Sequence, residues 1–217
     1  MVLGEAEAHV WRASLCSADP ECGRAWEILS QDERARAERF HFERDKRRFV
    51  LCRAALRTLL AEYAGMAAED VSLQYGPYGK PCLPASYGLE FNVSHSLDVA
   101  VFALARHAVG VDIEAIRPVR HALRVAESFF APSELAELQL AAPEDLDAAF
   151  LRCWTRKEAY VKGFGDGLTM PLESFAVGLD GDPGLGSWRF FNIDSGPGFM
   201  AALAVDCAGT TVVQRTL

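Results

Sequence analysis

The sequence predicts an α+β fold made of two similar halves, because two patterns occur twice along the chain. Phe91-Asn92-Val93 and Phe191-Asn192-Ile193 are each followed by a short polar turn and an apolar run, which is typical of a β-hairpin. Helical patterns that begin at Phe49 and Phe150 precede the two hairpins at a nearly constant offset. Chance agreement between short patterns is the alternative. If the halves are related, the cleft between them is the expected ligand site.

Each expected half contains similar elements in the same order. The first, residues 1–107, is predicted to contain a polar helix opened by Asp32-Glu33-Arg34, an apolar helix that begins at Phe49 and stops at Gly65, and a hairpin that returns over 99–104. The second, residues 108–217, is predicted to contain a strand over 109–114, a polar helix opened by Pro132-Ser133-Glu134, a helix over 147–162 that Gly163 ends, and a hairpin that returns over 199–205. The stretch Gly163-Phe164-Gly165-Asp166-Gly167 is expected to be a helix end and a turn, not a nucleotide-binding loop.

The composition narrows the class of protein and its partners. Half of the 217 residues are hydrophobic, which supports at least one packed core. The net charge of -8 argues against long nucleic acid as a partner. The sequence shows no secretory signal and no apolar run that could span a membrane, and its six cysteines form no C-x-x-C pair. We therefore expect a cytoplasmic protein with reduced, mostly buried thiols that binds neither nucleic acid nor membranes.

Two acidic residues on one predicted strand are candidates for a metal site. In Val109-Gly110-Val111-Asp112-Ile113-Glu114 apolar and acidic residues alternate, so Asp112 and Glu114 share one face. Two neighbouring carboxylates repel each other unless a hard cation or hydrogen bonds compensate. A half-exposed strand with its charges in water is the alternative, and the hexapeptide alone favours it.

A third carboxylate lies on the predicted helix over 147–162. The apolar stripe of this helix includes Trp154 and Val161, and Glu158 falls on the same stripe. A carboxylate on a core-facing stripe is costly unless it is paired or bound to a metal. An intrahelical ion pair with Lys162, four residues later, is the alternative. Because a surface pair would not need the buried face, we favour a functional role for Glu158.

Basic residues concentrate in one short stretch of this acidic chain. Of the 22 Lys and Arg residues, nine lie between positions 34 and 57: Arg34, Arg36, Arg39, Arg44, Lys46, Arg47, Arg48, Arg53 and Arg57. Such a concentration could bind a compact polyanion such as the phosphates of a nucleotide. A solvated helix face is the alternative, since acidic residues are interleaved.

Two predicted loops add candidate phosphate ligands. Tyr75-Gly76-Pro77-Tyr78-Gly79-Lys80-Pro81 presents Lys80 on a rigid turn, and Asn92-Val93-Ser94-His95-Ser96 presents Ser94 and His95 at the turn of the first hairpin. Adjacent strand residues point to opposite faces, so Ser94 and His95 are not expected to act as nucleophile and base. Phosphate binding is the favoured interpretation, and a turn with local side-chain hydrogen bonds is the alternative.

Taken together, these segments resemble the 4′-phosphopantetheinyl transferases of the Sfp type. The family pattern is Gly-[Val/Ile]-Asp, a long gap, and [Trp/Phe]-[Ser/Thr/Cys]-x-Lys-Glu-[Ala/Ser]-x-x-Lys. Every fixed position is matched by Gly110-Val111-Asp112 and, after 41 intervening residues, by Trp154-Thr155-Arg156-Lys157-Glu158-Ala159-Tyr160-Val161-Lys162. The Tyr-Gly-Lys-Pro and Phe-Asn-Val-Ser-His segments resemble the family too, in the same order, and the likeness covers residues 30–205.

The resemblance implies a fold, a reaction and partners. The fold is a pair of α+β halves related by a pseudo-twofold axis, with the active site in the cleft between them. The substrate is coenzyme A and the cofactor is Mg²⁺, with Mn²⁺ as an alternative ion. The partner is an apo acyl, peptidyl or aryl carrier protein, whose serine receives the 4′-phosphopantetheine group while 3′,5′-ADP is released. A pseudo-dimeric chain of this kind is expected to be a monomer.

The resemblance also assigns roles to residues of this chain. It implies that Asp112, Glu114 and Glu158 hold the metal ion, that Glu158 is the general base for the carrier serine, and that Lys162 neutralises charge on the phosphates. The residues that it places at the nucleotide phosphates are Arg36, Arg44, Arg48, Lys80, Ser94, His95, Lys157 and Lys162.

The chain departs from the family pattern at several positions. Phe49 stands where the family often has Thr, the position of Glu114 can carry an amide, and the segment 117–143, where the family recognises the carrier, matches weakly. Two other functions are alternatives: a metal-dependent hydrolase of coenzyme A or a nucleotide, and a non-catalytic coenzyme A-binding module. Lys157-Glu158 together with Lys162 argue against the module, because a binder needs phosphate donors but no carboxylate on the core stripe.

Overall fold

The computed structural model describes residues 1–16, 19–165 and 170–217. The first part of the chain forms these elements: β1 (Glu7–Ser14), α1 (Asp19–Ile28), α2 (Gln31–Ala37), α3 (Glu43–Ala64), β2 (Gln74–Tyr75), β3 (Pro81–Cys82), β4 (Glu90–Ser96) and β5 (Val99–Ala105). The second part forms these: β6 (Val109–Ala115), α4 (Ala122–Phe129), α5 (Pro132–Gln139), α6 (Leu146–Phe164), β7 (Trp188–Ile193), β8 (Phe199–Asp206) and β9 (Thr211–Thr216).

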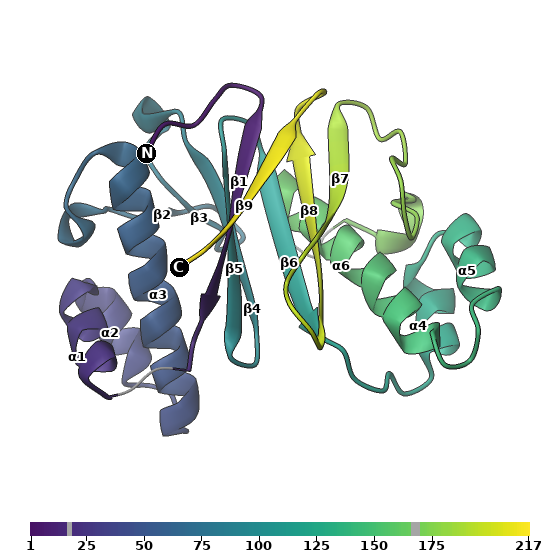
Figure 1. Cartoon of the computed structure of the whole chain (residues 1–217), viewed down its shortest axis with the longest axis horizontal. Coiled ribbons are helices and arrows are strands. Elements are labelled where there is room, and N and C mark those ends of the chain that lie inside the picture. The colour runs from purple at the N-terminus through teal and green to yellow at the C-terminus, as the bar shows by residue number, and fades with distance from the viewer. Residues whose placement is uncertain (17–18, 166–169) are drawn as a thin grey trace.

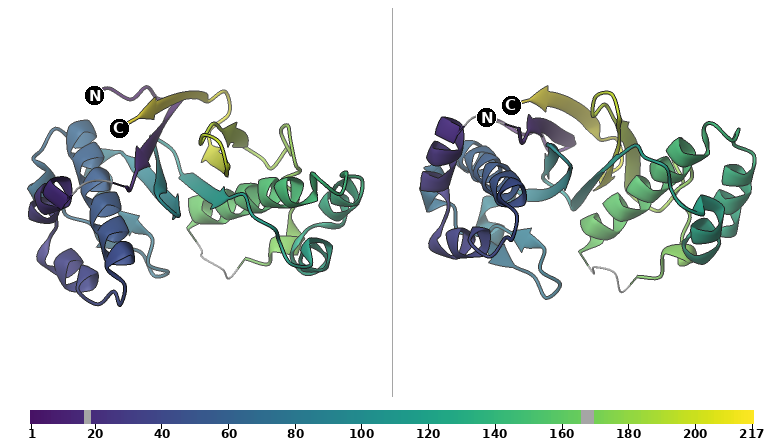
Figure 2. Two further views of the ribbon diagram at one scale, coloured as in Figure 1. Left: turned by 60° about the horizontal axis from the view of Figure 1, so that its bottom comes forward. Right: turned by 90° about the horizontal axis from the view of Figure 1, so that it is seen from below.

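Two sheets pack face to face at the centre of the molecule, and helices cover their outer sides (Figure 1). One sheet has the strand order β4-β5-β1-β9 and the other β6-β8-β7, while β2 and β3 form a small separate pair. The long helix α3 covers the first sheet and α6 covers the second, and the views in Figure 2 show the same layers from other sides. The predicted α+β class is confirmed, and a helix followed by a hairpin occurs in both parts of the chain.

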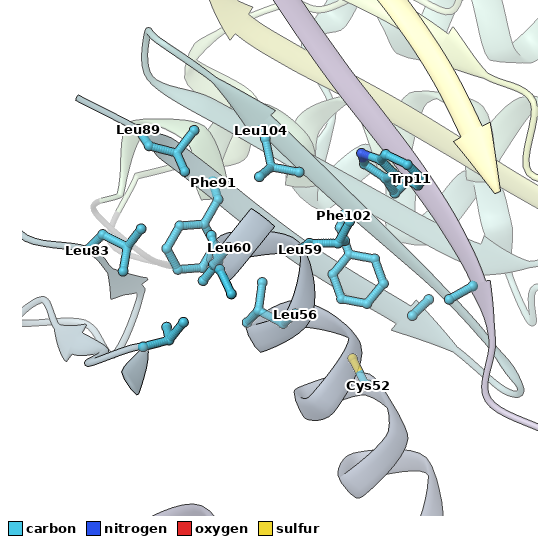
Figure 3. Close-up of a cluster of buried hydrophobic side chains, with 14 of the residues drawn as sticks. Trp11, Cys52, Leu56, Leu59, Leu60, Leu83, Leu89, Phe91, Phe102 and Leu104 are labelled. Atoms are coloured by element: carbon cyan, nitrogen blue, oxygen red, sulfur yellow. The ribbon is translucent and has the colours of Figure 1, made fainter. Parts of the chain in front are cut away.

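The alternation of side chains along the central strands builds this layered core. On β5 the side chains of Ala100, Phe102 and Leu104 face α3, and those of Val101 and Ala103 face the second sheet. All seven residues of β5 are buried because both of its faces are covered. Figure 3 shows the α3 side of this core, where leucines of the helix meet aromatic and leucine side chains of the sheet.

The helix boundaries differ from the sequence prediction in two places. Helix α3 begins at Glu43, six residues before Phe49, because the charged run before Phe49 consists largely of good helix formers. It ends as predicted at Gly65, which has a left-handed φ of 70°. Helix α6 continues past Gly163 and is capped by Gly165 at φ 89°. Residues Asp166 and Gly167 of the predicted turn lie outside the described residues.

Close contact between α6 and β6 explains two glycines of the sequence motifs. A Cβ atom on Gly110 would lie 2.0 Å from the carbonyl oxygen of Ala159 and 2.3 Å from the amide nitrogen of Gly163. A Cβ atom on Gly163 would in turn lie 2.7 Å from the Trp188 ring. The helix can therefore approach the strand this closely only because both positions lack a side chain. Gly163 serves packing instead of ending the helix.

The strand β9 links the two parts of the chain. Although it belongs to the predicted second half, it pairs in parallel with β1, with Glu7 opposite Thr211 and Arg12 opposite Thr216. The division at residues 107 and 108 stays a prediction.

Two further expectations concern the surface and the thiols. Within the described residues, no helix is both long and apolar enough to cross a membrane. None of the six cysteines, all of which lie within the described residues, forms a disulfide, and only Cys52 and Cys153 are buried. The prediction that most of them are buried is therefore wrong.

Replacing Gly110 by Ala should destabilise the protein by about 1–3 kcal/mol or more, because the new methyl group would overlap backbone atoms of α6. Gly23→Ala on α1 is a matched control, since nothing lies within 4 Å of the added Cβ atom. It should leave stability unchanged or raise it by up to ~1 kcal/mol. Urea denaturation of both variants measures the difference, and equal stability of the two would contradict the close packing.

Candidate active site

The strands β4 and β6 belong to different sheets, and polar side chains of β4 connect them. Asn92 Oδ1 accepts a hydrogen bond of 3.0 Å from the Val111 amide, and Ser96 Oγ accepts one of 3.0 Å from the Ala115 amide. With Ser94 between them, these side chains alternate along β4 and face β6. They satisfy backbone groups of β6 that have no strand partner on this side. We call Asn92, Ser94 and Ser96 together the polar seam.

The sequence analysis missed Asn92 and Ser96, and it placed this segment at the hairpin turn. The structure corrects this placement: the segment is strand through Ser96, and the turn lies at Leu97, which has a φ of 51°. The signal that could have found the seam is the period-two spacing of short polar residues within a strand.

Asp112 lies at the centre of the site, buried to 4% exposure on β6. Its Oδ1 accepts hydrogen bonds from Ser94 Oγ at 2.8 Å and from Lys162 Nζ at 2.5 Å. The ammonium of Lys162 also donates to Ser94 Oγ at 3.0 Å. Three elements, β4, β6 and α6, thus meet at one carboxylate, and the cation and hydroxyl offset the cost of burying its charge.

Glu114 and Glu158 share the electrostatic environment of Asp112. Burial raises the pKa of Glu158 above its ordinary value, and the negative charges of Asp112 and Glu114 raise it further, against the opposing effect of Lys162. The pKa of Glu114 is also raised, first by burial and then by Asp112. Both side chains therefore lie where a negative charge is only partly compensated, by Lys162 near Glu158 and by Lys162 and Arg117 near Glu114.

These carboxylates fit a hard cation by their chemistry. Among the described residues, no three His, Cys, Asp or Glu side chains already converge as a metal-binding group. However, Asp112 Oδ2 is buried and has no hydrogen-bond partner in the described part of the chain. A buried acceptor without a partner, beside two carboxylates whose ionisation is disfavoured, is what a Mg²⁺ ion would satisfy.

Lys80 lies at the same end of α6 as Lys162, on the turn between β2 and β3. Its Nζ donates to the carbonyl oxygen of Gly163 at 3.0 Å, and burial lowers its pKa. A pocket of about 210 Å³ lies here, bordered by Lys80, Asn92, Val161 and Lys162. The structure thus places Lys80 and Lys162 at the border of the same pocket.

The other predicted phosphate ligands lie around β4 and the start of α3. The exposed His95 has a pKa lowered by partial burial and by the charges of Lys162 and Arg48. Arg48 Nε donates to Asp98 Oδ1 at 2.8 Å, which raises the pKa of this guanidinium. Arg44 is largely exposed beside Asp45. These residues lie at one edge of the site, but Arg48 is already engaged with a carboxylate.

Lys157 does not reach this site. It is fully buried on the other face of α6, where its Nζ lies 2.7 Å from Glu134 Oε2. The same ammonium donates to the carbonyl oxygens of Leu172 and Phe175 at 2.8 and 2.7 Å. With all its donors used in this way, Lys157 fixes α6 to α5 and to the segment around Leu172.

A groove of about 490 Å³ borders the acidic side of the site. It is lined by Glu114 of β6, by Arg117 and Arg120 of the segment between β6 and α4, and by apolar residues, among them Phe150 and Trp154 of α6. Of the three carboxylates, Glu114 borders this groove.

Comparison with known proteins identifies relatives of both parts of the chain. The family model described as 4′-phosphopantetheinyl transferase superfamily matches residues 108–193, and the model described as 4′-phosphopantetheinyl transferase, N-terminal, matches residues 13–107. The 4′-phosphopantetheinyl transferase HetI of Nostoc sp. is 38% identical over 183 residues, which cover 82% of this chain and 77% of HetI. The 4′-phosphopantetheinyl transferase Sfp of Bacillus subtilis is 30% identical over 155 residues, covering 71% of this chain and 68% of Sfp.

Glu158→Gln should stabilise the metal-free protein at neutral pH. A carboxyl group whose pKa is raised on folding contributes stability that is fully present below its unfolded pKa near 4.5, and that contribution is lost as the pH rises through the folded pKa. Glutamine has no charge to bury, so the melting temperature of the variant should exceed that of the wild type by roughly 2–4 °C at pH 7.

The difference should shrink as the pH falls through the raised pKa of Glu158 towards 4.5, and it should be smallest below that value. Thermal melts in the presence of a chelator measure both values, with the exposed Glu127→Gln on α4 as a control for charge alone. A variant that is less stable than the wild type at pH 7 would contradict the uncompensated charge.

Proposed function

The chain belongs to the 4′-phosphopantetheinyl transferase superfamily, and we propose that it transfers the 4′-phosphopantetheine group of coenzyme A to a serine of an apo acyl, peptidyl or aryl carrier protein. One observation carries this proposal: the buried Asp112, whose Oδ2 has no hydrogen-bond partner among the described residues, lies near Glu158 and is bound by Lys162 and Ser94. Carboxylates and a lysine at one point suit transfer of a phosphoryl group, which requires charge neutralisation and a proton acceptor.

Coenzyme A would bind between the two parts of the chain. Lys80 and Lys162 supply cationic donors at the pocket that they border, and Ser94 supplies a hydroxyl. Of the other predicted phosphate ligands, Arg36 and His95 border a second pocket on the neighbouring face of β4. We do not assign Lys157 to the substrate, because its donors are used inside the protein.

Asp112, Glu114 and Glu158 would hold Mg²⁺, or Mn²⁺ as an alternative ion. Such an ion, when bound, would supply Lewis-acid polarisation of the pyrophosphate and offset the repulsion among the carboxylates. Lys162 binds Asp112 in the structure and would remain near the phosphates as a second source of positive charge.

Glu158 would act as the proton acceptor. The serine oxygen forms a bond to the phosphorus that carries the pantetheine arm, and the bond from that phosphorus to the bridging oxygen breaks, so 3′,5′-ADP leaves with the electron pair. The serine proton passes to the Glu158 carboxylate. Its raised pKa supports this role, because a base works best when its pKa lies closer to the working pH. Lys162 would stabilise the negative charge that develops on the leaving phosphate.

The carrier would approach along the groove beside Glu114. The groove combines apolar side chains with the cations of Arg117 and Arg120, and it opens to the surface next to the proposed site of transfer. We further propose a cytoplasmic monomer: both sides of the site come from one chain, and cysteines that form no disulfide among the described residues are typical of a reducing compartment.

A direct test is to incubate the protein with coenzyme A, Mg²⁺ and several apo carriers, and to measure the intact mass of each carrier. Addition of one phosphopantetheine group, together with release of 3′,5′-ADP, is the expected result. Release of free 4′-phosphopantetheine with unmodified carriers would instead indicate a hydrolase. Binding of coenzyme A with no reaction across all carriers would indicate a binding module.

Glu158→Gln should reduce transfer at least about 100-fold, since it removes the proton acceptor, while binding of coenzyme A largely survives. The rate of carrier modification and the affinity measured by calorimetry give the two quantities. Glu21→Gln is the control, because it removes an exposed carboxylate of α1, outside the segment where the carrier is expected to bind. Unchanged turnover of the Glu158 variant would exclude this residue from the chemistry.

A further inference from the structure

Four hydrogen-bonded side chains join β1 to the end of α3. His9 of β1 is 2% exposed, and its Nδ1 lies 2.5 Å from the hydroxyl oxygen of Tyr63 on α3. Trp11 Nε1 donates to the same hydroxyl oxygen at 3.1 Å, and His9 Nε2 lies 3.3 Å from Glu7 Oε2. The rings of His9 and Tyr63 also pack edge to face. We call Glu7, His9, Trp11 and Tyr63 together the histidine network.

The donors and acceptors of the network determine the tautomer of His9. The indole of Trp11 can only donate, so the Tyr63 oxygen accepts from it and the Tyr63 proton can be donated to His9 Nδ1. The proton of the neutral imidazole is then on Nε2, which donates to Glu7 Oε2. The opposite tautomer would place the lone pair of Nε2 against a carboxylate oxygen. Each member of the network therefore has its partner while His9 is neutral.

Protonation of His9 would disrupt this arrangement. An imidazolium carries a proton on both nitrogens, so Nδ1–H would meet the Tyr63 proton and the hydroxyl would have to turn away. The pKa of His9 is lowered, first by burial and further by the charge of Arg215, against the opposing hydrogen bond and charge of Glu7. The surroundings of His9 thus favour its neutral form.

Charged and titratable groups reach the network from several elements. They are Glu7 of β1, Tyr63 and Glu62 of α3, Arg215 of β9, and the N-terminal ammonium, which donates to the Glu62 carbonyl oxygen at 3.2 Å. On the neighbouring strands, the residues opposite His9 are the apolar Leu104 of β5 and Val213 of β9. Of these groups, Arg215 has a charge that a protonated His9 would repel.

Arg215 connects the network to the last strand. Its guanidinium carbon lies 5.5 Å from the centre of the Trp11 ring, which is within the range of a cation–π interaction. β9 is the outer strand of its sheet and pairs with β1, and its residues 214–216 are exposed. Because β9 buries few side chains, the contact between Arg215 and Trp11 matters for its attachment.

We propose that the histidine network is a pH-sensitive switch that holds β9 against β1 while His9 is neutral and loosens the strand when His9 is protonated. The positive charge on the imidazolium would repel Arg215 from its place on Trp11, and the turned hydroxyl would weaken the link between β1 and α3. A histidine whose pKa is lowered on folding favours the folded form fully above its ordinary value of 6.5, and this contribution is lost as the pH falls from 6.5 through the folded pKa.

Hydrogen exchange of the segment 208–217, followed by mass spectrometry at about pH 7.5 and about pH 5.5, tests this inference. After correction for intrinsic exchange rates, opening of β9 in the wild type should increase by about threefold or more at the lower pH, while β5 stays protected. His9→Gln keeps a neutral donor and acceptor, so its β9 should open equally at both pH values. No increase in the wild type, the same increase in His9→Gln, or an equal increase in every segment would overturn the inference.

Two further variants make the test specific to the network. His41→Gln removes an exposed histidine between α2 and α3 and should keep the pH dependence of the wild type. Tyr63→Phe removes the donor to His9 Nδ1, so its β9 should open more than that of the wild type already at neutral pH. A Tyr63→Phe variant with unchanged exchange of β9 would contradict the link between α3 and the strand.

Nitrogen NMR of the wild type decides the question if His9→Gln does not fold. The expected spectrum shows His9 as the Nε2–H tautomer at neutral pH, with protonation only below pH 6.5. An Nδ1–H tautomer, or a His9 that is half protonated at or above pH 6.5, would overturn the inference.

Discussion

The buried carboxylate of Asp112 is the constraint on which the rest of the site depends. A charge at this depth is stable only with nearby compensation, and the compensation comes from outside its own strand: a hydroxyl from β4 and an ammonium from α6. The helix supplies its lysine only because it lies almost against the strand, which the bare backbone of Gly110 allows. Three features therefore depend on one another: the contact between the two sheets, the missing side chain at Gly110 and the ion pair between Asp112 and Lys162.

The alternation of side chains along β4 divides the charged groups into two sets. Ser94 faces the carboxylates, and His95 faces the arginines that surround Phe49. A strand that serves two faces in this way keeps one group of cations apart from the acidic residues that would otherwise neutralise it. Positive groups can therefore lie on both faces of β4 although the chain has a net charge of -8.

Elements whose residues follow a local pattern could be predicted from the sequence. The two hairpins and the helices α2, α3, α5 and α6 follow from hydrophobic period and capping residues. Lys157 could not be placed, because its partner Glu134 lies on another helix and no local pattern links the two. The polar seam could not be predicted for the same reason, because its hydrogen bonds join strands of two different sheets. The parallel pair of β1 and β9 was missed because it joins opposite ends of the sequence.

That parallel pair also sets the order of events during synthesis. The first strand enters the centre of its sheet with β5 on one side, but its other edge stays open until residues 211–216 have left the ribosome. Until then the edge of β1 presents unpaired backbone groups that another chain could bind. Pairing of β1 with β9 joins segments that are far apart in the sequence. The conformational entropy lost in closing such a long loop makes this step slow. Until residues 211–216 are made, β1 therefore has a neighbouring strand on one edge only, although the acidic and basic residues of the candidate site are already present in the chain.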